Sequence, residues 1–458
     1  MSHLARQLPI RFFESGIKRR KTFRYWRELE RSQWFPREEL EAMQFGALRR
    51  LVAHAFEHCP YYREQWRNAG LEPRTLANLG EFSRWPLIDQ NTVRAHRREM
   101  RAQVAGMRLL SKATGGSTGI PLEFDLDHDS NDRRVAASFR GYNWASAGPG
   151  TKQLYVWGGP VGELPGWKRL KNAWYDRLYR RRVINCFHFG AERASEFLAR
   201  LAEYRPDAIV AYTNPLYEFA RSLDDTNLVP FSPRSIVVGA EKLHDFQRER
   251  IEKVFRAPVF ETYGSREFML IGAECDRHSG LHLSMEHLLV EVVDDNGQPA
   301  QAGAEGNVVI TDLFNYGMPF VRYMNGDRAI AGLDRCGCGR GLPVLRKVVG
   351  RQLDMLSTGD GRVVPGEFFP HLLKEFSAVR RFQVVQTSAD DIRLRLVVSH
   401  KWSDADQSRL TREIQSVVGP LCRFAIDIVD DIPLTGAGKH RVVVNLSRRS
   451  DQETAPRH

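Results

Sequence analysis

Cysteine is scarce in this chain, with six residues in 458, and long apolar runs are absent. Six thiols are too few for the disulfide framework of a small secreted protein. No stretch approaches the ~18 consecutive apolar residues that a membrane span requires. Residues 1–20 also lack the apolar core of a secretory signal. These absences argue against integral membrane contact and predict a cytoplasmic protein.

Internal repeats and low-complexity tracts are also absent, and 42% hydrophobic with 27% charged residues is typical of a folded protein. The 67 basic residues exceed the 56 acidic ones, which gives a formal net charge of +11. Such an excess suits anionic ligands such as ATP or coenzyme A, an acidic carrier protein or an anionic membrane surface, but it is equally typical of a solvated basic surface. No motif for nucleic-acid recognition accompanies it, so no nucleic-acid partner is expected.

Hydrophobic periodicity predicts an α/β fold. Apolar residues recur at helical spacing from Pro36 to about Arg101. Beyond them, helices alternate with the short apolar strands AIVAY, SIVVGA and PVFETYG, the alternation expected of a wound α/β sheet. Ligands of such sheets bind at the carboxyl ends of the strands. After Leu288 turn residues separate strands of antiparallel character, and the chain closes with a small α+β unit.

These changes divide the chain into a large domain and a small one. The large N-terminal α/β domain spans residues 1–350 and consists of a helical layer (1–105), an α/β core (106–287) and a β-rich subdomain (288–350). Residues 351–458 form a small α+β C-terminal domain. The Gly-flanked junction between them, VVGRQLD, would serve as a hinge, which makes the C-terminal domain a mobile lid.

A loop rich in glycine and hydroxyl groups follows the helical layer. It consists of Thr114, Gly115, Gly116, Ser117, Thr118 and Gly119. Glycine lets the main chain approach closely, so backbone N–H groups and hydroxyls of such a loop can wrap phosphate oxygens. The loop does not have the Walker pattern. A loop of this composition is by itself more often an ordinary turn, so its interpretation depends on further motifs.

Several motifs in a fixed order resemble the adenylate-forming superfamily, and within it the phenylacetate-CoA ligase-like branch that includes the CapK proteins. They are HAFEHCPYYREQW, LGEFSRWPLIDQNTVR, KATGGSTGIPL, VVGAEKL, ETYGSREF, VRYMNGDRA, GRQLDM and PLTGAGKHRVV. The resemblance covers nearly the whole chain. It implies an enzyme that uses ATP and Mg²⁺ to convert a carboxylic acid into an acyl-adenylate and pyrophosphate, with coenzyme A as the acyl acceptor.

The resemblance also implies roles for single residues around the base and the phosphates. Gly239, Ala240 and Glu241 form the strand end and turn beside the adenine. Tyr263 stacks on the adenine, an arrangement that suits an aromatic face and a purine. Gly264 and Ser265 line the α-phosphate, and Arg266 stands where many relatives have threonine. Glu267 holds magnesium, because carboxylate oxygens suit a hard cation.

The remaining implied residues bind the ribose and drive the reaction. Asp327, in a Gly-Asp turn, accepts hydrogen bonds from the ribose hydroxyls, since a carboxylate is an acceptor only. Arg351 contacts ribose or phosphate. Lys439, in a glycine-rich loop near the C-terminus, enters the site to neutralise charge on the carboxylate and the α-phosphate, and withdraws when the lid turns.

Two other hypotheses stay open. In the first, the acyl group passes to an amine, a sugar or a carrier protein, as a CapK-like role in polysaccharide or natural-product assembly would require. In the second, the chain is a catalytically inactive relative, because Ile120 replaces the usual lysine of the phosphate loop, Ala240 a common glycine and Arg266 a common threonine. The resemblance is also compatible with a homodimer.

Cysteine and histidine residues in two clusters predict a structural zinc site. Cys336 and Cys338 share one tight loop, and 61 residues before them Cys275 opens a segment that contains two histidines. Zinc prefers sets of four sulfur and nitrogen ligands. The fourth ligand is His282, in the GLH position that resembles the CapK-like pattern, with His278 as the alternative. The competing interpretation is unbound thiols in a surface loop.

Residues 166–183 interleave aromatic and basic side chains in the sequence GWKRLKNAWYDRLYRRRV. The commoner arrangement of such a helix buries one aromatic face in the core and exposes a charged face. Alternatively, a basic aromatic helix lies on a membrane surface or binds an acidic carrier protein. Elsewhere, Trp157, Tyr212 and Phe268 fall near the motif strands, which favours an apolar or aromatic carboxylic acid as substrate.

Overall fold

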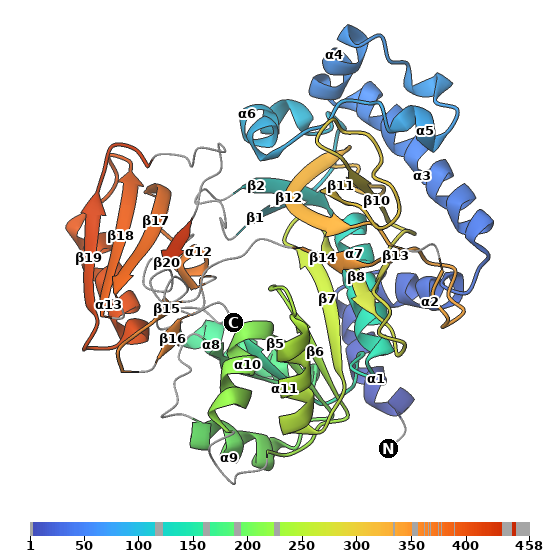
Figure 1. Cartoon of the computed structure of the whole chain (residues 1–458). Coiled ribbons are helices and arrows are strands. Elements are labelled where there is room, and N and C mark those ends of the chain that lie inside the picture. The colour runs from blue at the N-terminus through green and yellow to red at the C-terminus, as the bar shows by residue number, and fades with distance from the viewer. Residues whose placement is uncertain are drawn as a thin grey trace, which may run out of the picture.

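The computed structural model shows a large body and a smaller C-terminal unit beside it (Figure 1). It describes residues 3–114, 122–158, 165–186, 194–223, 230–332 and 335–349 and, with short gaps, 356–432 and 442–445. Within these residues, no helix combines the length and the apolar character needed to cross a bilayer.

The N-terminal part is helical, as expected. Its elements are α1 (His3–Arg11), the π-helix η1 (Phe12–Ile17), α2 (Thr22–Ser32), α3 (Arg37–His58), α4 (Pro60–Asn68), the 3₁₀ helix η2 (Pro73–Thr75), α5 (Leu79–Phe82) and α6 (Gln90–Met100). Helix α3 ends where it does because Pro60 follows, and Cys59 takes the extended backbone (φ −110°, ψ 110°) that a residue before proline prefers. Asp89 is the N-cap of helix α6, and its side chain accepts a hydrogen bond from the N–H of Thr92.

An eight-stranded sheet forms the centre of the molecule, in the order β13-β9-β8-β7-β6-β5-β3-β4. Its strands are β3 (Gln153–Trp157), β4 (Arg181–Asn185), β5 (Ala208–Tyr212), β6 (Ser235–Gly239), β7 (Val259–Ser265), β8 (Met269–Glu274), β9 (Leu281–Leu283) and β13 (Val344–Leu345). Strands β4, β3, β5, β6 and β7 run parallel to one another. From β7 onward, through β8 and β9 to β13, each neighbouring pair is antiparallel. The α/β fold class is therefore confirmed.

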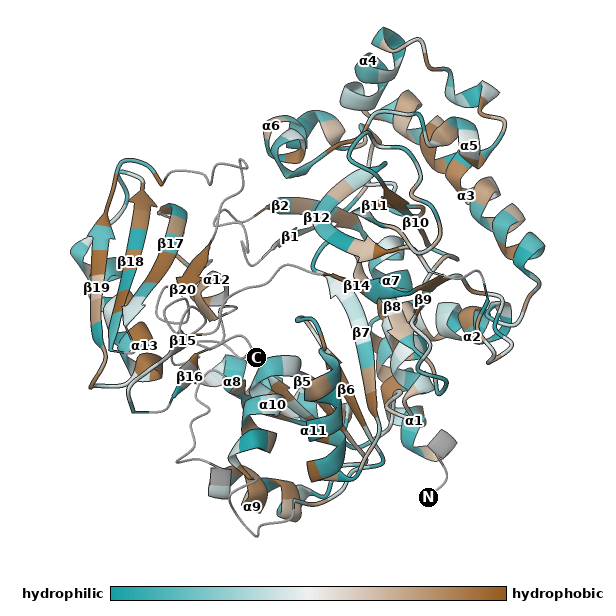
Figure 2. Cartoon of the chain, in the orientation of Figure 1, coloured by the Kyte–Doolittle hydropathy of each residue, from teal (hydrophilic) through white to brown (hydrophobic). Residues whose placement is uncertain are grey.

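Helices precede and connect the parallel strands. They are α7 (His128–Trp144), α8 (Gly166–Leu178), α9 (Ala194–Tyr204), α10 (Thr213–Ser222) and α11 (Asp245–Phe255). Strands β5 and β6 are buried along their whole length, as parallel strands between two layers must be. Figure 2 shows β6 in brown, whereas the outer helix α11 is teal over most of its length.

Helix α8 differs from the arrangement expected for its sequence. We expected one aromatic face in the core, but no residue of the helix is buried. That expectation is wrong because periodicity reports that apolar residues share a face and does not report whether protein covers that face.

The β-rich part contains a second, four-stranded sheet in the order β10-β11-β12-β14. Its strands are β10 (Leu288–Val293), β11 (Glu305–Asp312), β12 (Tyr323–Ile330) and β14 (Lys347–Val348), all antiparallel. A two-stranded hairpin, β1 (Leu109–Ala113) with β2 (Glu123–Asp127), precedes α7. The hydrophobic core of this half joins α3 and α4 to β2, β8 and β10–β12.

The C-terminal unit has α+β character. It contains β15 (Leu356–Ser357), β16 (Val363–Val364), α12 (Phe368–Leu373), β17 (Val379–Ser388), β18 (Asp391–Val398), α13 (Asp404–Val418), β19 (Arg423–Ile428) and β20 (Val443–Asn445). Its main sheet has the order β19-β18-β17-β20. Helix α13 begins with a capping box of Ser403 and Asp406. The hinge expected around residues 350–355 lies outside the described residues.

Candidate active site

The parallel strands end at one edge of the central sheet. Register pairs Tyr212 at the end of β5 with Gly239 at the end of β6, and Trp157 closes the adjacent β3. The rings of Trp157 and Tyr212 lie 4.3 Å apart between centroids. Because α/β sheets bind ligands beyond the carboxyl ends of their strands, this edge is the expected location of a site.

The expected adenine and ribose residues meet beside this edge. The hydroxyl of Tyr263, on β7, donates to Oδ2 of Asp327, on β12, at 2.9 Å. Asn325 completes the contact, since its Nδ2 lies 2.8 Å from the Tyr263 hydroxyl and 2.7 Å from Asp327 Oδ2. The backbone N–H of Asp327 returns a bond to Asn325 Oδ1 at 3.0 Å. These bonds fix the carboxylate against the tyrosine.

Asn325 was not predicted from the sequence. The sequence does contain one indication of its role: Asn325 lies two residues before Asp327 on an expected strand, and this spacing places both side chains on the same face. Because many polar pairs on strands have that spacing, the pattern alone did not distinguish this one.

The turn after Tyr263 positions Ser265 and Glu267. Glu267 is buried and accepts a hydrogen bond from the Tyr323 hydroxyl at 3.2 Å. The buried Oγ of Ser265 has no hydrogen-bond partner within the described part of the chain. A buried hydroxyl without a partner is costly, and a ligand oxygen would satisfy it. Gly264 is required here, because a Cβ at that position would lie 2.0 Å from the Met269 carbonyl oxygen.

The turn after β6 contains the other expected adenine neighbours. Gly239 packs against Thr262, whose Oγ1 would lie 2.5 Å from an added Cβ. Ala240 adopts a left-handed backbone with φ 67°, a conformation that favours glycine. Glu241 accepts the backbone N–H of Asn214 at 2.7 Å, and burial raises the pKa of Glu241 to about 7.

Thr114 and Lys112 mark one side of the expected phosphate loop. Gly115, Gly116, Ser117, Thr118 and Gly119 lie outside the described residues, as do Arg351 and Lys439. Thr114 Oγ1 accepts the N–H of Leu122, which closes the β1–β2 hairpin at 2.9 Å. Lys112 Nζ lies 2.8 Å from Asn131 Oδ1, and burial together with Arg134 and Arg266 lowers the pKa of Lys112 to about 8. Cationic groups therefore gather at the base of this loop.

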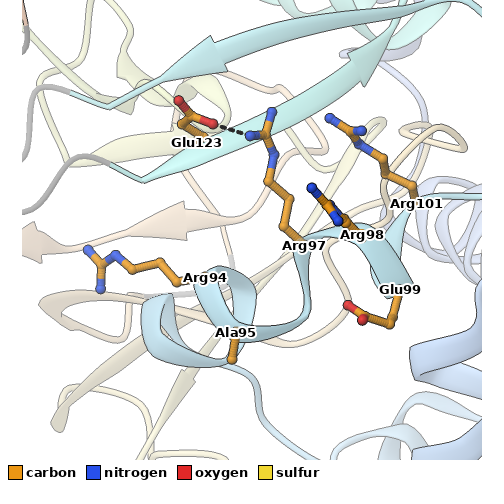
Figure 3. Close-up of a pocket in the computed structure, with 7 residues that line it drawn as sticks. All are labelled: Arg94, Ala95, Arg97, Arg98, Glu99, Arg101 and Glu123. Atoms are coloured by element: carbon orange, nitrogen blue, oxygen red, sulfur yellow. Dashed lines mark hydrogen bonds and ion pairs between the residues drawn. The ribbon is translucent and has the colours of Figure 1, made fainter. Parts of the chain in front are cut away.

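Helix α6 presents an arginine-rich pocket beside the same hairpin. The pocket has a volume of about 520 Å³ and is lined by Arg94, Ala95, Arg97, Arg98, Glu99, Arg101 and Glu123. Figure 3 shows Arg97, Arg98 and Arg101 rising from the helix toward the strand that carries Glu123. Arg97 and Arg101 both pair with the buried Asp125, at 3.0 and 2.7 Å. We did not predict this pocket; the sequence indication was the run RAHRREMR.

A cluster of cysteine and histidine side chains forms around strands β8, β9 and β13 of the central sheet. Ligand atoms of Cys275, His282, Cys336 and Cys338 all lie within 4.8 Å of one another. The sulfur atoms of Cys275 and Cys336 are 3.8 Å apart, and Cys338 Sγ lies 3.3 Å from His282 Nε2. A tetrahedron with Zn–S bonds of about 2.3 Å has S···S edges of about 3.8 Å, so the spacing fits zinc. Burial and Arg340 lower the pKa of His282 to about 4, which leaves the imidazole neutral, as a metal ligand must be.

The alternative ligand, His278, makes other contacts. Its Nδ1 lies 3.2 Å from Glu274 Oε2 and 3.3 Å from the Arg248 guanidinium, and its ring packs on Phe260. The geometry therefore favours His282 over His278 as the fourth ligand of the cluster, as the sequence pattern predicts.

Comparison with known proteins identifies the relatives of this chain. A family model described as the CapK C-terminal domain matches residues 356–446. The phenylacetate-coenzyme A ligase of Thermus thermophilus is 26% identical over 453 residues, which cover 90% of this chain and 98% of the relative. Protein CapK of Staphylococcus aureus is 23% identical, and the match covers 94% of this chain and 94% of the relative.

A solved structure supports the fold. The structure of 2-hydroxyisobutyryl-CoA ligase in complex with 2-HIB-AMP and CoA superimposes with a TM-score of 0.62 at 20% identity, over 93% of this chain and 94% of that one. The fold is thus that of the adenylate-forming ligases. Within that class, the chain is a homologue of phenylacetate-CoA ligase and of CapK, which confirms the family expected from the motifs.

Proposed function

We propose that the chain is an ATP-dependent ligase that activates a carboxylic acid as an acyl-adenylate and transfers the acyl group to coenzyme A. The Tyr263–Asn325–Asp327 contact carries this proposal. An adenosine stacked on the Tyr263 ring would place its ribose at the carboxylate that the tyrosine hydroxyl holds, so one network would orient base and sugar together.

The groups around the phosphates support the same reaction. Ser265 offers a hydroxyl without a partner within the described residues, and Glu267 a buried carboxylate that would hold Mg²⁺. The metal would neutralise charge on the departing pyrophosphate. Attack of the substrate carboxylate on the α-phosphorus requires no protein nucleophile, so catalysis would rest on positioning and electrostatics. Lys112 and Arg266 add positive charge at the base of the expected phosphate loop. This charge would compensate for Ile120, which occupies the usual lysine position of that loop.

Lys439 would be the catalytic lysine, supplied by a mobile lid. We place the domain boundary at residues 350–351, with the large domain before it and the lid after it. The match of residues 356–446 to a C-terminal domain model supports this division and includes Lys439. Arg351 at the hinge would contact ribose or phosphate.

The arginine pocket on α6 favours coenzyme A as the acceptor. Four arginines and two glutamates line it, which leaves a positive excess suited to the phosphates of coenzyme A. The rings of Trp157 and Tyr212 at the strand ends favour an aromatic or apolar acid.

A CapK-like acceptor is the second candidate, supported by the matched C-terminal model. In that case the acyl group would pass to an amine, a sugar or a carrier protein. Product analysis with and without coenzyme A separates the two, because only the first gives an acyl-CoA.

We also propose that Cys275, His282, Cys336 and Cys338 bind a structural zinc ion. Four protein ligands would close the site to water, so the ion would stabilise the fold and take no part in adenylation.

Carboxylate-dependent ATP–pyrophosphate exchange over aryl, fatty and hydroxy acids tests the central proposal. We expect exchange with one class of acid and its loss, on the order of 10²-fold or more, in Lys439→Ala. A matched control is Lys401→Ala, an exposed lysine in the same C-terminal unit. If ATP binds but no acid supports exchange, the inactive-relative hypothesis replaces this one.

A further inference from the structure

Helix α8 exposes its largest apolar side chains. Trp167, Leu170 and Trp174 are 63%, 75% and 50% exposed. Every residue from Pro165 to Trp174 is exposed, so this is not a core helix with a few stray apolar residues. Spacings of three and four residues place the three side chains on one face. The helix thus presents a continuous apolar stripe to solvent.

Basic residues flank this stripe. At 100° per residue, Lys171 lies along one side of the stripe and Arg177 along the other. Lys168 and Arg169 add charge on the remaining faces. The only acidic residue of the helix, Asp176, pairs with Arg181 at 2.7 Å. Within the described residues, no acidic group lies within 4.0 Å of Lys168, Arg169 or Lys171, so their charge is available to a partner.

The neighbouring π-helix η1 extends the same surface. The ring of Phe13 packs edge-on against Trp174 and Tyr175, at 5.0 and 5.5 Å between centroids. The adjacent Phe12 is exposed, and Lys18 lies over the Phe13 ring. Exposed aromatic side chains and cations therefore alternate across both helices, and their mutual packing holds α8 in place.

We propose that the α8–η1 surface, defined by residues 12–18 and 166–177, binds the surface of an anionic lipid bilayer. Tryptophan, leucine and phenylalanine would insert at the boundary between headgroups and acyl chains, and the lysine and arginine side chains would contact lipid phosphates. With 13 residues, α8 is too short to span a bilayer, so the contact is peripheral. A two-fold interface with a second copy would set basic residues against basic residues, which disfavours that occupant.

Co-sedimentation with vesicles tests this proposal. The full-length protein is mixed with vesicles of phosphatidylcholine alone or of phosphatidylcholine with phosphatidylglycerol. We expect binding to the anionic vesicles, weakened by salt, and little binding to the neutral ones. The double variant Trp167→Ser/Leu170→Ser should bind on the order of tenfold more weakly. Both side chains are exposed, so its thermal stability should match that of the wild type.

Leu421→Ser is the matched control, because Leu421 is 69% exposed and belongs to the C-terminal unit, outside the residues that define the α8–η1 surface. Its vesicle binding should equal that of the wild type. Three results overturn the proposal: no binding to anionic vesicles, equal loss of binding in Leu421→Ser and in the double variant, or a dimer in sedimentation velocity that the double variant abolishes. The last result would assign the surface to a second copy. None of these outcomes depends on adenylation.

Discussion

In addition to the β13–β9 pairing, two groups of side chains link the chain segment from β12 to β13 to strands β7–β9, and the two groups differ in chemistry. At one end Tyr263, Asn325 and Asp327 form a hydrogen-bonded group beside the strand ends. At the other end Cys275 and His282 meet Cys336 and Cys338. The first group belongs to the nucleotide site that we propose. In the second, the potential ligand atoms face one another, so little remains for a substrate.

This difference predicts that the two attachments can be broken separately. Damage at the hydrogen-bonded end should reduce activity and leave stability nearly unchanged, whereas damage at the thiol end should do the reverse. Both ends lie in one β-rich region, so a change that affected both properties equally would contradict the division.

The largest effect is expected for Asp327→Ala. Hydrogen bonds to a charged acceptor contribute about 1.5–3 kcal/mol each. The loss of those to the ribose should lower kcat/KM for ATP on the order of 10²-fold, measured by ATP–pyrophosphate exchange. Tyr263→Phe is the control, since it keeps the ring and removes only the hydroxyl that bonds Asp327; its loss should be severalfold. An unchanged KM for ATP in Asp327→Ala would remove this residue from the nucleotide site.

Cys336→Ser breaks the other end. We expect metal analysis to show loss of bound zinc and the Tm to fall by several degrees, because a structural metal contributes directly to folding free energy. Exchange activity measured well below the Tm should stay close to that of the wild type. His278→Asn is the matched control, because His278 neighbours the cluster and contacts Glu274 instead. Zinc retained in Cys336→Ser, or lost in His278→Asn, would contradict the assignment.

Lys112 predicts a pH dependence of the KM for ATP. Burial and nearby arginines lower the pKa of Lys112 to about 8, and an anionic ligand binds best to its protonated form. The KM for ATP should therefore be flat below about pH 8 and rise above it, at most tenfold per pH unit. Lys112→Arg keeps its charge and should remove the rise, whereas Lys112→Met should give a higher KM at every pH. A rise that persists in Lys112→Arg would assign it to another group.

Much of the fold was predictable because the strands have strong local patterns. The wound sheet and the antiparallel region followed from apolar runs, and the importance of the Tyr263 and Asp327 motifs followed from resemblance. The structure adds that β13, which follows the expected boundary at residue 288, joins the central sheet, so that boundary does not separate the two sheets cleanly. Strand order depends on long-range pairing, which local pattern does not report.

The remaining features depended on tertiary context. Asn325 acquires its role only when β7 and β12 come together, and the α6 arginines form a pocket only beside the β1–β2 hairpin. For α8, the pattern predicted an apolar face correctly and its burial wrongly. The sequence shows alanine at position 240, but only the structure shows its left-handed backbone.

Ala240→Gly should have the smallest effect, and it tests whether the adenine turn carries strain. A left-handed backbone costs a non-glycine residue about 1–2 kcal/mol. Glycine relieves that cost but adds unfolded-state entropy worth about 0.4–1 kcal/mol, so the net stabilisation should be about 0.5–1 kcal/mol. Thermal unfolding should show a Tm higher by about 1–2 °C.

The matched control for that variant is Ala69→Gly. Ala69 is exposed and has φ −86°, so glycine relieves no strain there and only the entropic cost remains. Its Tm should therefore fall slightly while that of Ala240→Gly rises. If both variants lose stability, the left-handed backbone of Ala240 costs less free energy than its φ implies. Opposite signs would instead mean that the chain tolerates a strained turn at the end of β6.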